Sequence, residues 1–170
     1  MIITLVAHSP KQGINQDTAL SSQILPIAPS FNNVIIHDDI DVCIIEGNKN
    51  EIIVKNEETA NLIKFKVKDS ALVIKCKGSG TGRKRPKVIV MVKMLSGISI
   101  IGDSEVSTIG ELSNIKLELD IYGDGSIIVC TKASEVNTLI KGLGKIEVKG
   151  NFQNTSVSKD AWGNMVTTYK

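Results

Sequence analysis

Apolar and polar residues alternate along much of the chain, and this alternation predicts β-strands. The clearest case is residues 115–121, where Ile, Leu, Leu and Ile alternate with Lys, Glu and Asp. Successive side chains of a strand point to opposite faces. We therefore expect the apolar residues from Ile115 to Ile121 to be buried and the charged residues between them to face water.

Shorter strands are expected earlier in the chain, each bounded by Asp, Asn, Gly or Pro. They cover residues 33–36, 40–45, 51–55, 64–68, 72–76 and 87–94. The run from Val88 to Val92 is apolar at every position, which is typical of a strand buried on both faces. Only residues 57–63 favour a helical turn.

Residues 97–167 contain a repeat of about twenty residues. Segments that begin at Gly102, Gly123, Gly142 and Ala161 follow one another at steps of 21, 19 and 19 residues. At three positions of the repeat, the residues of the four successive units are mostly apolar. The first position is occupied by Ile98, Leu119, Thr138 and Val157, and the second by Ile100, Ile121, Ile140 and Lys159. The third position is occupied by Val106, Ile127, Ile146 and Met165. A unit of two short strands cannot bury its own apolar face and must stack on its neighbours. The repeat predicts a parallel β-solenoid with coils of about 20 residues, and an antiparallel barrel or sandwich is the alternative.

The pattern also divides the chain. Residues 1–30 are rich in Ser, Gln and Asn and contain Pro10, Pro26 and Pro29, which predicts an irregular N-terminal arm before one domain at 31–170. The first residues have no basic leader and do not make a complete secretory signal. No apolar run approaches 18 residues, so we expect no transmembrane segment.

Composition strengthens the prediction of strands. The chain has 25 Ile and 15 Val against 11 Leu and 7 Ala, and β-branched residues favour strands over helices. The 20 Lys and Arg nearly balance the 18 Asp and Glu, for a net charge of +2. An all-α protein and a wholly disordered chain are excluded.

Positive charge is concentrated between Lys75 and Lys87, where Lys77, Arg83, Lys84 and Arg85 flank a run of Gly, Ser and Thr at 78–82. The segment does not fit a phosphate-binding loop, because the required Gly-Lys-Ser/Thr ending is missing. Aromatic residues that would stack on bases are missing as well. We interpret the segment as a solvated loop and expect no nucleic-acid partner.

Candidate chemical groups are few. Cys43, Cys76 and Cys130 lie far apart in apolar runs, which predicts buried apolar side chains rather than a disulfide framework or a zinc site. His8 lies in the arm. His37 precedes Asp38 and Asp39, and on a strand His37 and Asp39 would share a face. No Ser in the sequence has the features of a catalytic nucleophile. We therefore interpret His37, Asp38 and Asp39 as the polar end of a strand.

Two further groups of residues are candidate binding sites. Asp38, Asp39 and Asp41 could offer oxygen ligands to calcium, but only Asp39 and Asp41 would share a face, so we expect no metal site. Trp162 and Tyr169 could form an aromatic platform for a sugar or a partner. For Trp162 we favour a cap on the last coil of the core. We expect no catalytic, cofactor-binding or metal-binding residues and no cofactor.

The run from Phe31 to Gly47 resembles the opening of the putative autotransporter adhesin, head GIN domain family of bacteria. Residues 61–63, 67–74, 88–92 and 95–98 are similar to the strands that follow in that family, and the resemblance covers about residues 31–166. It implies a right-handed parallel β-helix of the pectate-lyase type and a role in cell adhesion. It also implies export to the cell surface or periplasm and a homo-oligomer, with a trimer as one form.

The leading hypothesis is a non-catalytic binding module, the head of a cell-surface adhesin, whose partner is a surface protein or glycan. A scaffold that assembles through exposed sheet edges is the first alternative. A carbohydrate-active β-helix enzyme is the second, because similar folds carry unrelated functions.

Overall fold

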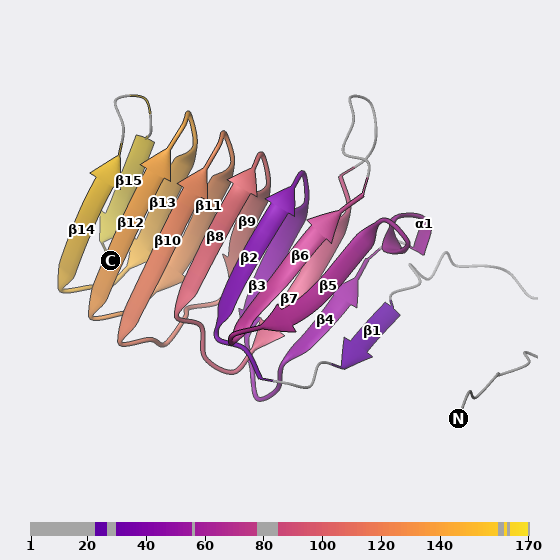
Figure 1. Ribbon diagram of the computed structural model, residues 1–170. Helices are drawn as coiled ribbons and strands as arrows, with labels where there is room; N and C mark the ends of the chain where they lie inside the picture. Colours follow the sequence, from indigo (N-terminus) through magenta and orange to yellow (C-terminus); the bar gives the residue numbers. More distant parts are fainter. Residues whose placement is uncertain are drawn as a thin grey trace, which may run out of the picture.

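The computed structural model describes residues 23–26, 30–55, 57–77, 85–159, 162 and 164–169. Their strands form two open sheets that face each other (Figure 1). In spatial order, sheet A consists of β1 (Gln23–Pro26), β4 (Glu51–Val54), β7 (Lys87–Val92), β3 (Asp41–Glu46), β9 (Glu105–Ile109), β11 (Ser126–Thr131), β13 (Lys145–Gly150) and β15 (Asn164–Tyr169). Sheet B consists of β14 (Asn154–Lys159), β12 (Glu135–Lys141), β10 (Lys116–Tyr122), β8 (Gly97–Gly102), β2 (Asn33–Asp38), β6 (Ala71–Cys76) and β5 (Ile63–Lys68).

The predicted fold class is right in being all-β and wrong as a right-handed parallel β-helix of the pectate-lyase type. The chain forms two mixed sheets, in which β1 pairs with β4, β4 with β7 and β5 with β6 in antiparallel orientation. The strands do not follow chain order either, because β2 lies directly between β6 and β8. The other strand pairs are parallel, so an all-antiparallel sandwich is also excluded.

A tight turn explains why the first half departs from the prediction. Asp69 and Ser70 join β5 to β6, and both have positive φ angles, of 51° and 60°. Two successive residues with positive φ make the type I′ turn that connects antiparallel strands. The chain therefore reverses at this point instead of continuing into the next parallel strand.

In the second half, the expected column of inward residues is confirmed. Ile127 lies opposite Val106 on one side and Ile146 on the other, in parallel register. Ile121 lies in the same way between Ile100 and Ile140. These side chains fill the space between the two sheets and are almost completely buried. The repeat therefore predicted strand register correctly, although it did not predict the whole architecture.

Two predictions of burial are wrong in detail. Ile115 is 84% exposed, because it precedes β10 and does not share the alternation of that strand. In β7, Val88, Val90 and Val92 are buried, whereas Ile89 and Met91 are only half-buried on the outer face. That strand is packed fully on one side and only partly on the other.

The helical turn is present as α1 (Glu57–Ala60). No helix in the described segments is long and apolar enough to cross a membrane. Within the expected N-terminal arm, residues 23–26 form β1 and pair with β4. Residues 1–22 and 27–29, which include the first residues of the chain and His8, lie outside the described residues.

Candidate functional site

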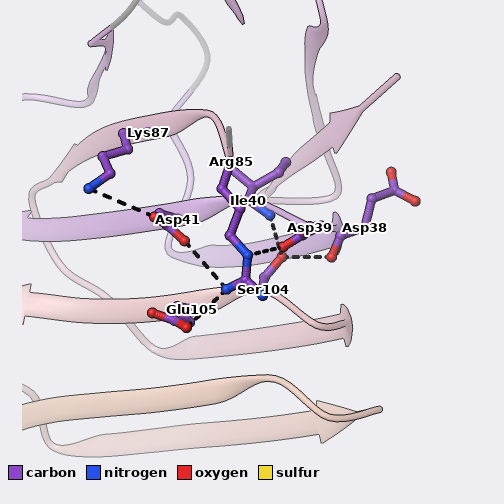
Figure 2. Close-up of polar contacts among 8 residues, drawn as sticks. All are labelled: Asp38, Asp39, Ile40, Asp41, Arg85, Lys87, Ser104 and Glu105. Carbon is purple, nitrogen blue, oxygen red and sulfur yellow. Dashed lines mark hydrogen bonds and ion pairs between the residues drawn. The ribbon is translucent and has the colours of Figure 1, made fainter. Parts of the chain in front are cut away.

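A cluster of charged residues lies where β7, β3 and β9 begin (Figure 2). Arg85 is at its centre: its Nε atom is 2.5 Å from Oδ1 of Asp39, and Nη1 is 2.9 Å from Oε1 of Glu105 and 3.8 Å from Oδ1 of Asp41. Lys87 Nζ lies 4.0 Å from Oδ2 of Asp41. The strand register produces the cluster, since Asp41 lies opposite both Lys87 and Glu105.

Burial and neighbouring charges act on Asp41 in opposite directions. Partial burial raises the pKa of this carboxyl group, and the nearby Glu105 carboxylate raises it further. Arg85 and Lys87 lower the same pKa. The two cations therefore offset part of the rise in the pKa of Asp41.

Ser104 supports the cluster from inside the protein. Its Oγ donates a hydrogen bond to the carbonyl oxygen of Asp38 at 2.9 Å and accepts one from the backbone N–H of Ile40 at 3.1 Å. Asp38 has a positive φ of 74°, where the chain leaves sheet B for sheet A. The fully buried Ser104 therefore fixes this crossing between the two sheets.

The charged residues of the cluster are arranged as ion pairs rather than as a metal site. Asp39 and Asp41 both face Arg85, so a guanidinium group occupies the place that a calcium ion would take between them. Nowhere in the described part of the chain does a group of His, Cys, Asp or Glu side chains have the geometry to hold a metal ion. The arrangement is an ion-pair network at the surface.

Replacing Arg85 by Met is expected to destabilise the protein more at pH 7 than at pH 4. Without Arg85 the pKa of Asp41, already raised in the folded state, rises further. A carboxyl group with a raised folded pKa contributes stability at low pH that is lost as the pH rises through that pKa. We expect a loss of about 1 kcal/mol or less at pH 7, because these side chains are partly exposed.

Urea unfolding of wild type and Arg85→Met at both pH values measures the effect. Lys93→Met is the control, because Lys93 is exposed and makes no ion pair with the described side chains. A difference between wild type and Arg85→Met that is the same at both pH values would show that the network carries no net electrostatic effect.

An open groove lies next to the network on the outer face of sheet A. It has a volume of about 360 Å³. Its floor is one row across four neighbouring strands, formed by Ile89, Cys43, Ser107 and Ile128. Its charged rim is formed by Asp41, Lys55, Lys87 and Glu105. We call these eight residues the sheet A groove.

The groove exists because small residues interrupt an apolar surface. Ser107 lies between Cys43 and Ile128 in the row, and its short side chain leaves space above it. Ile128 is 38% exposed, and Ile109 at the end of β9 is 57% exposed. Parallel sheets normally have both faces covered. Within the described residues, the part of this face around Ile128 and Ile109 is therefore an exposed surface of apolar and small residues with charges beside it.

The structure places the suggested His–Asp pair in different surroundings. His37 lies half-buried on the outer face of sheet B, opposite Lys75 and Ile101. Its pKa is lowered by burial and then by the Lys75 charge, against a smaller opposing effect of Asp38. Asp39 is paired with Arg85. The contacts of these residues do not join them into a catalytic triad.

The other candidate residues are distributed over the molecule. Cys76 is buried as expected, whereas Cys43 and Cys130 are only half-buried on the outer face of sheet A. Trp162 is 75% exposed, so the prediction that it caps the core is wrong. The side chain of Tyr169 and residues 78–84 of the basic segment lie outside the described residues.

The sequence pattern did not reveal Arg85 and Glu105 as neighbours of Asp39 and Asp41. Arg85 was assigned to a solvated loop, yet it is held by ion pairs at the start of β7. One signal for Glu105 was present, because it directly follows the Gly-Asp-Ser turn at 102–104 that marks the first repeat. The contact depends on β3 lying beside β9, a pairing of strands 64 residues apart.

The chain matches the family described as "Putative auto-transporter adhesin, head GIN domain" over residues 30–166. It belongs to that family. A comparison with curated proteins gave no match.

Solved structures with a similar fold come from Parabacteroides distasonis and Bacteroides fragilis. A putative lipid binding protein from Parabacteroides distasonis has a TM-score of 0.67 at 16% identity, over 88% of this chain and 67% of that chain. A putative adhesin from Bacteroides fragilis has a TM-score of 0.57 at 16% identity, over 93% and 100%. A putative adhesin from Parabacteroides distasonis has a TM-score of 0.54 at 15% identity, over 91% and 98%.

Proposed function

We propose that the protein is a non-catalytic adhesion module that acts at the cell surface and binds another surface molecule through the sheet A groove. The observation that carries this proposal is the open groove in the described structure, whose floor is the mainly apolar row of Ile89, Cys43, Ser107 and Ile128 beside a charged rim. Exposed apolar patches rimmed by polar groups are typical of interaction sites. Membership in an adhesin family supports the same conclusion.

The chemistry of the groove supports binding rather than catalysis. Glu105 and Asp41 are ion-paired with Arg85, and Lys87 lies close to Asp41. A general acid or base needs a free group directed at a substrate. The rim carboxylates instead neutralise neighbouring cations.

As part of this proposal, residues 31–170 act as one domain.

Attachment of protein-coated beads tests the proposed function. We expect beads that carry the wild-type protein to attach to at least one surface in a panel of bacterial and mammalian cells, more than beads that carry albumin. Attachment at the albumin level to every cell type would refute the adhesion role. Cleavage of an acidic polysaccharide that is lost in Asp39→Asn/Asp41→Asn protein would refute the non-enzymatic role.

Self-association through the β14 and β15 end is a second part of the proposal. These two strands are the last of their sheets, so in the described residues their outer backbone groups face no further strand. Val157 occupies an inward position opposite Thr138 and is still 47% exposed, because no next strand covers it. Open edges of this kind pair readily with another chain.

Light scattering at micromolar concentration measures this self-association. We expect a defined oligomer that is weakened by Val157→Lys, which places a charge at the exposed end of the core. The matched change Ile115→Lys, at an exposed position away from that end, should leave the oligomer intact. A strict monomer would refute the proposed self-association.

A further inference from the structure

Lysines collect on the outer face of sheet B at its β5 end. Lys64, Lys66 and Lys68 alternate along β5 with the inward residues Ile63, Phe65 and Val67. Lys75 lies on β6 directly opposite Lys64, and Lys77 follows the end of that strand. All five lysines are exposed. We call Lys64, Lys66, Lys68, Lys75 and Lys77 the basic face.

Ion-pair partners for these lysines are few among the described side chains. Lys68 lies 3.7 Å from a carboxylate oxygen of Asp69. Among the side chains that the structure describes, no carboxylate lies within ion-pair distance of the other four lysines.

Lysines on other strands are arranged differently. Lys116 pairs with Glu118 and Glu135, and Lys145 and Lys149 both pair with Glu147. At the basic face, by contrast, lysines lie next to other lysines. The neighbouring Lys77 lowers the pKa of Lys64, both through a hydrogen bond and through its charge. Such a group of cations would be stabilised by an anion from outside the protein.

Protection of a sheet edge does not account for the whole group. Lysines on an edge strand discourage pairing with another chain, and β5 is an edge strand. Lys75 lies on β6, which is covered by β5 on one side and by β2 on the other. Its charge is therefore away from the edge, and with Lys64 it forms a cationic pair across the two strands.

We propose that the basic face binds an anionic polysaccharide. Lys64, Lys66 and Lys68 are spaced two residues apart, roughly 7 Å, along a straight strand. A linear row of cations matches an extended polymer that carries a charge on successive sugars. Proteins that bind single-stranded nucleic acid add aromatic side chains on which the bases stack. The one aromatic residue of β5, Phe65, faces inward.

The basic face and the sheet A groove lie on the outer faces of opposite sheets, so they are separate sites. Binding of a polysaccharide to the basic face therefore goes beyond the proposed adhesion role of the groove. Binding to the basic face is measured with purified components and adhesion with cells. If one proposal is refuted, the other is still tested by its own measurement.

Calorimetric titration at 150 mM salt tests the inference with two polysaccharides, heparin for sulfate groups and polygalacturonate for carboxylates, and with neutral dextran as the blank. We expect wild type to bind at least one of the anionic polymers and not dextran. Whichever polymer binds more tightly identifies the preferred anion. Binding should weaken as salt is raised, since exposed charges are screened.

Two variants with the same change in net charge separate a site from a general charge effect. Lys64→Gln/Lys66→Gln/Lys75→Gln removes the centre of the basic face. Lys93→Gln/Lys132→Gln/Lys141→Gln removes three exposed lysines from other places. Each exposed ion pair contributes a small factor, so we expect about a tenfold loss of affinity for the first variant. The second variant should change affinity by no more than about twofold.

Three results would overturn the inference. The first is no binding of either anionic polymer by wild type. The second is an equal loss of affinity in both triple variants, which would show that only net charge matters. The third is tighter binding of single-stranded RNA or of phosphatidylglycerol vesicles than of either polysaccharide, which would assign the basic face to a nucleic acid or a membrane.

Discussion

Ile127→Asp is expected to lower the free energy of unfolding by about 3 kcal/mol or more, because it places a charge between the two sheets. Ile127 is completely buried and lies opposite Val106 and Ile146, both nonpolar. An unpaired carboxylate there has no described donor or cation to stabilise it. Urea unfolding followed by circular dichroism measures the loss.

The adjacent residue provides the matched control. Ile128 points to the outer face and is 38% exposed, so Ile128→Asp should cost less than about 1 kcal/mol. Ile127→Ala extends the test if the Asp variant does not fold, with an expected loss of about 2–5 kcal/mol. Equal destabilisation by Ile127→Asp and Ile128→Asp would contradict the assignment of the two faces of β11.

Gly123→Ala is expected to have the second large effect, a loss of roughly 3 kcal/mol or more from combined backbone strain and steric overlap. Gly123 has a φ of +135°, a conformation that residues with a side chain rarely adopt. A Cβ atom at this position would lie 2.6 Å from the carbonyl oxygen of Gly102 in the preceding turn. The turns of successive repeats stack on each other too closely for a methyl group.

Gly110→Ala separates the two causes of this effect. Gly110 also has a positive φ, of +80°, but an added Cβ would meet nothing within 4 Å. We expect a loss of about 1 kcal/mol from backbone strain only. Thermal unfolding measures both variants, with about 2–4 °C in Tm for each kcal/mol in a protein of this size. Equal shifts in Tm would contradict close stacking of the turns at Gly102 and Gly123.

The repeats explain which parts of the fold could be predicted from the sequence. Inward residues such as Val106, Ile127 and Ile146 recur at nearly constant spacing, so their column in sheet A followed directly from the pattern. The first half has no such period. Its β5–β6 turn uses Asp69 and Ser70 rather than the Asn-Gly or Asp-Gly pairs that identify a tight hairpin, so the reversal of the chain was missed.

The candidate site was harder to predict than the core. Asp39 and Asp41 were identified as a pair, but Arg85 and Glu105 reach them only because β7, β3 and β9 are neighbours in sheet A. A pattern of apolar residues indicates which face of a strand is buried. It does not indicate which distant strand lies beside it. The sheet A groove arises from such neighbours, whereas the basic face depends on the β5–β6 hairpin.

Competition between soluble protein and protein-coated beads tests the adhesion proposal most directly. Soluble wild type should block attachment of wild-type beads to the cells that they bind, whereas soluble Ile128→Glu, which places a charge on the groove floor, should not block it. Ile101→Glu is the control, because Ile101 lies on the outer face of the other sheet and is 42% exposed, close to the 38% of Ile128. We predict full blocking by Ile101→Glu protein and at least about a tenfold weaker effect of Ile128→Glu protein, and equal blocking by the two variants would contradict binding through the groove.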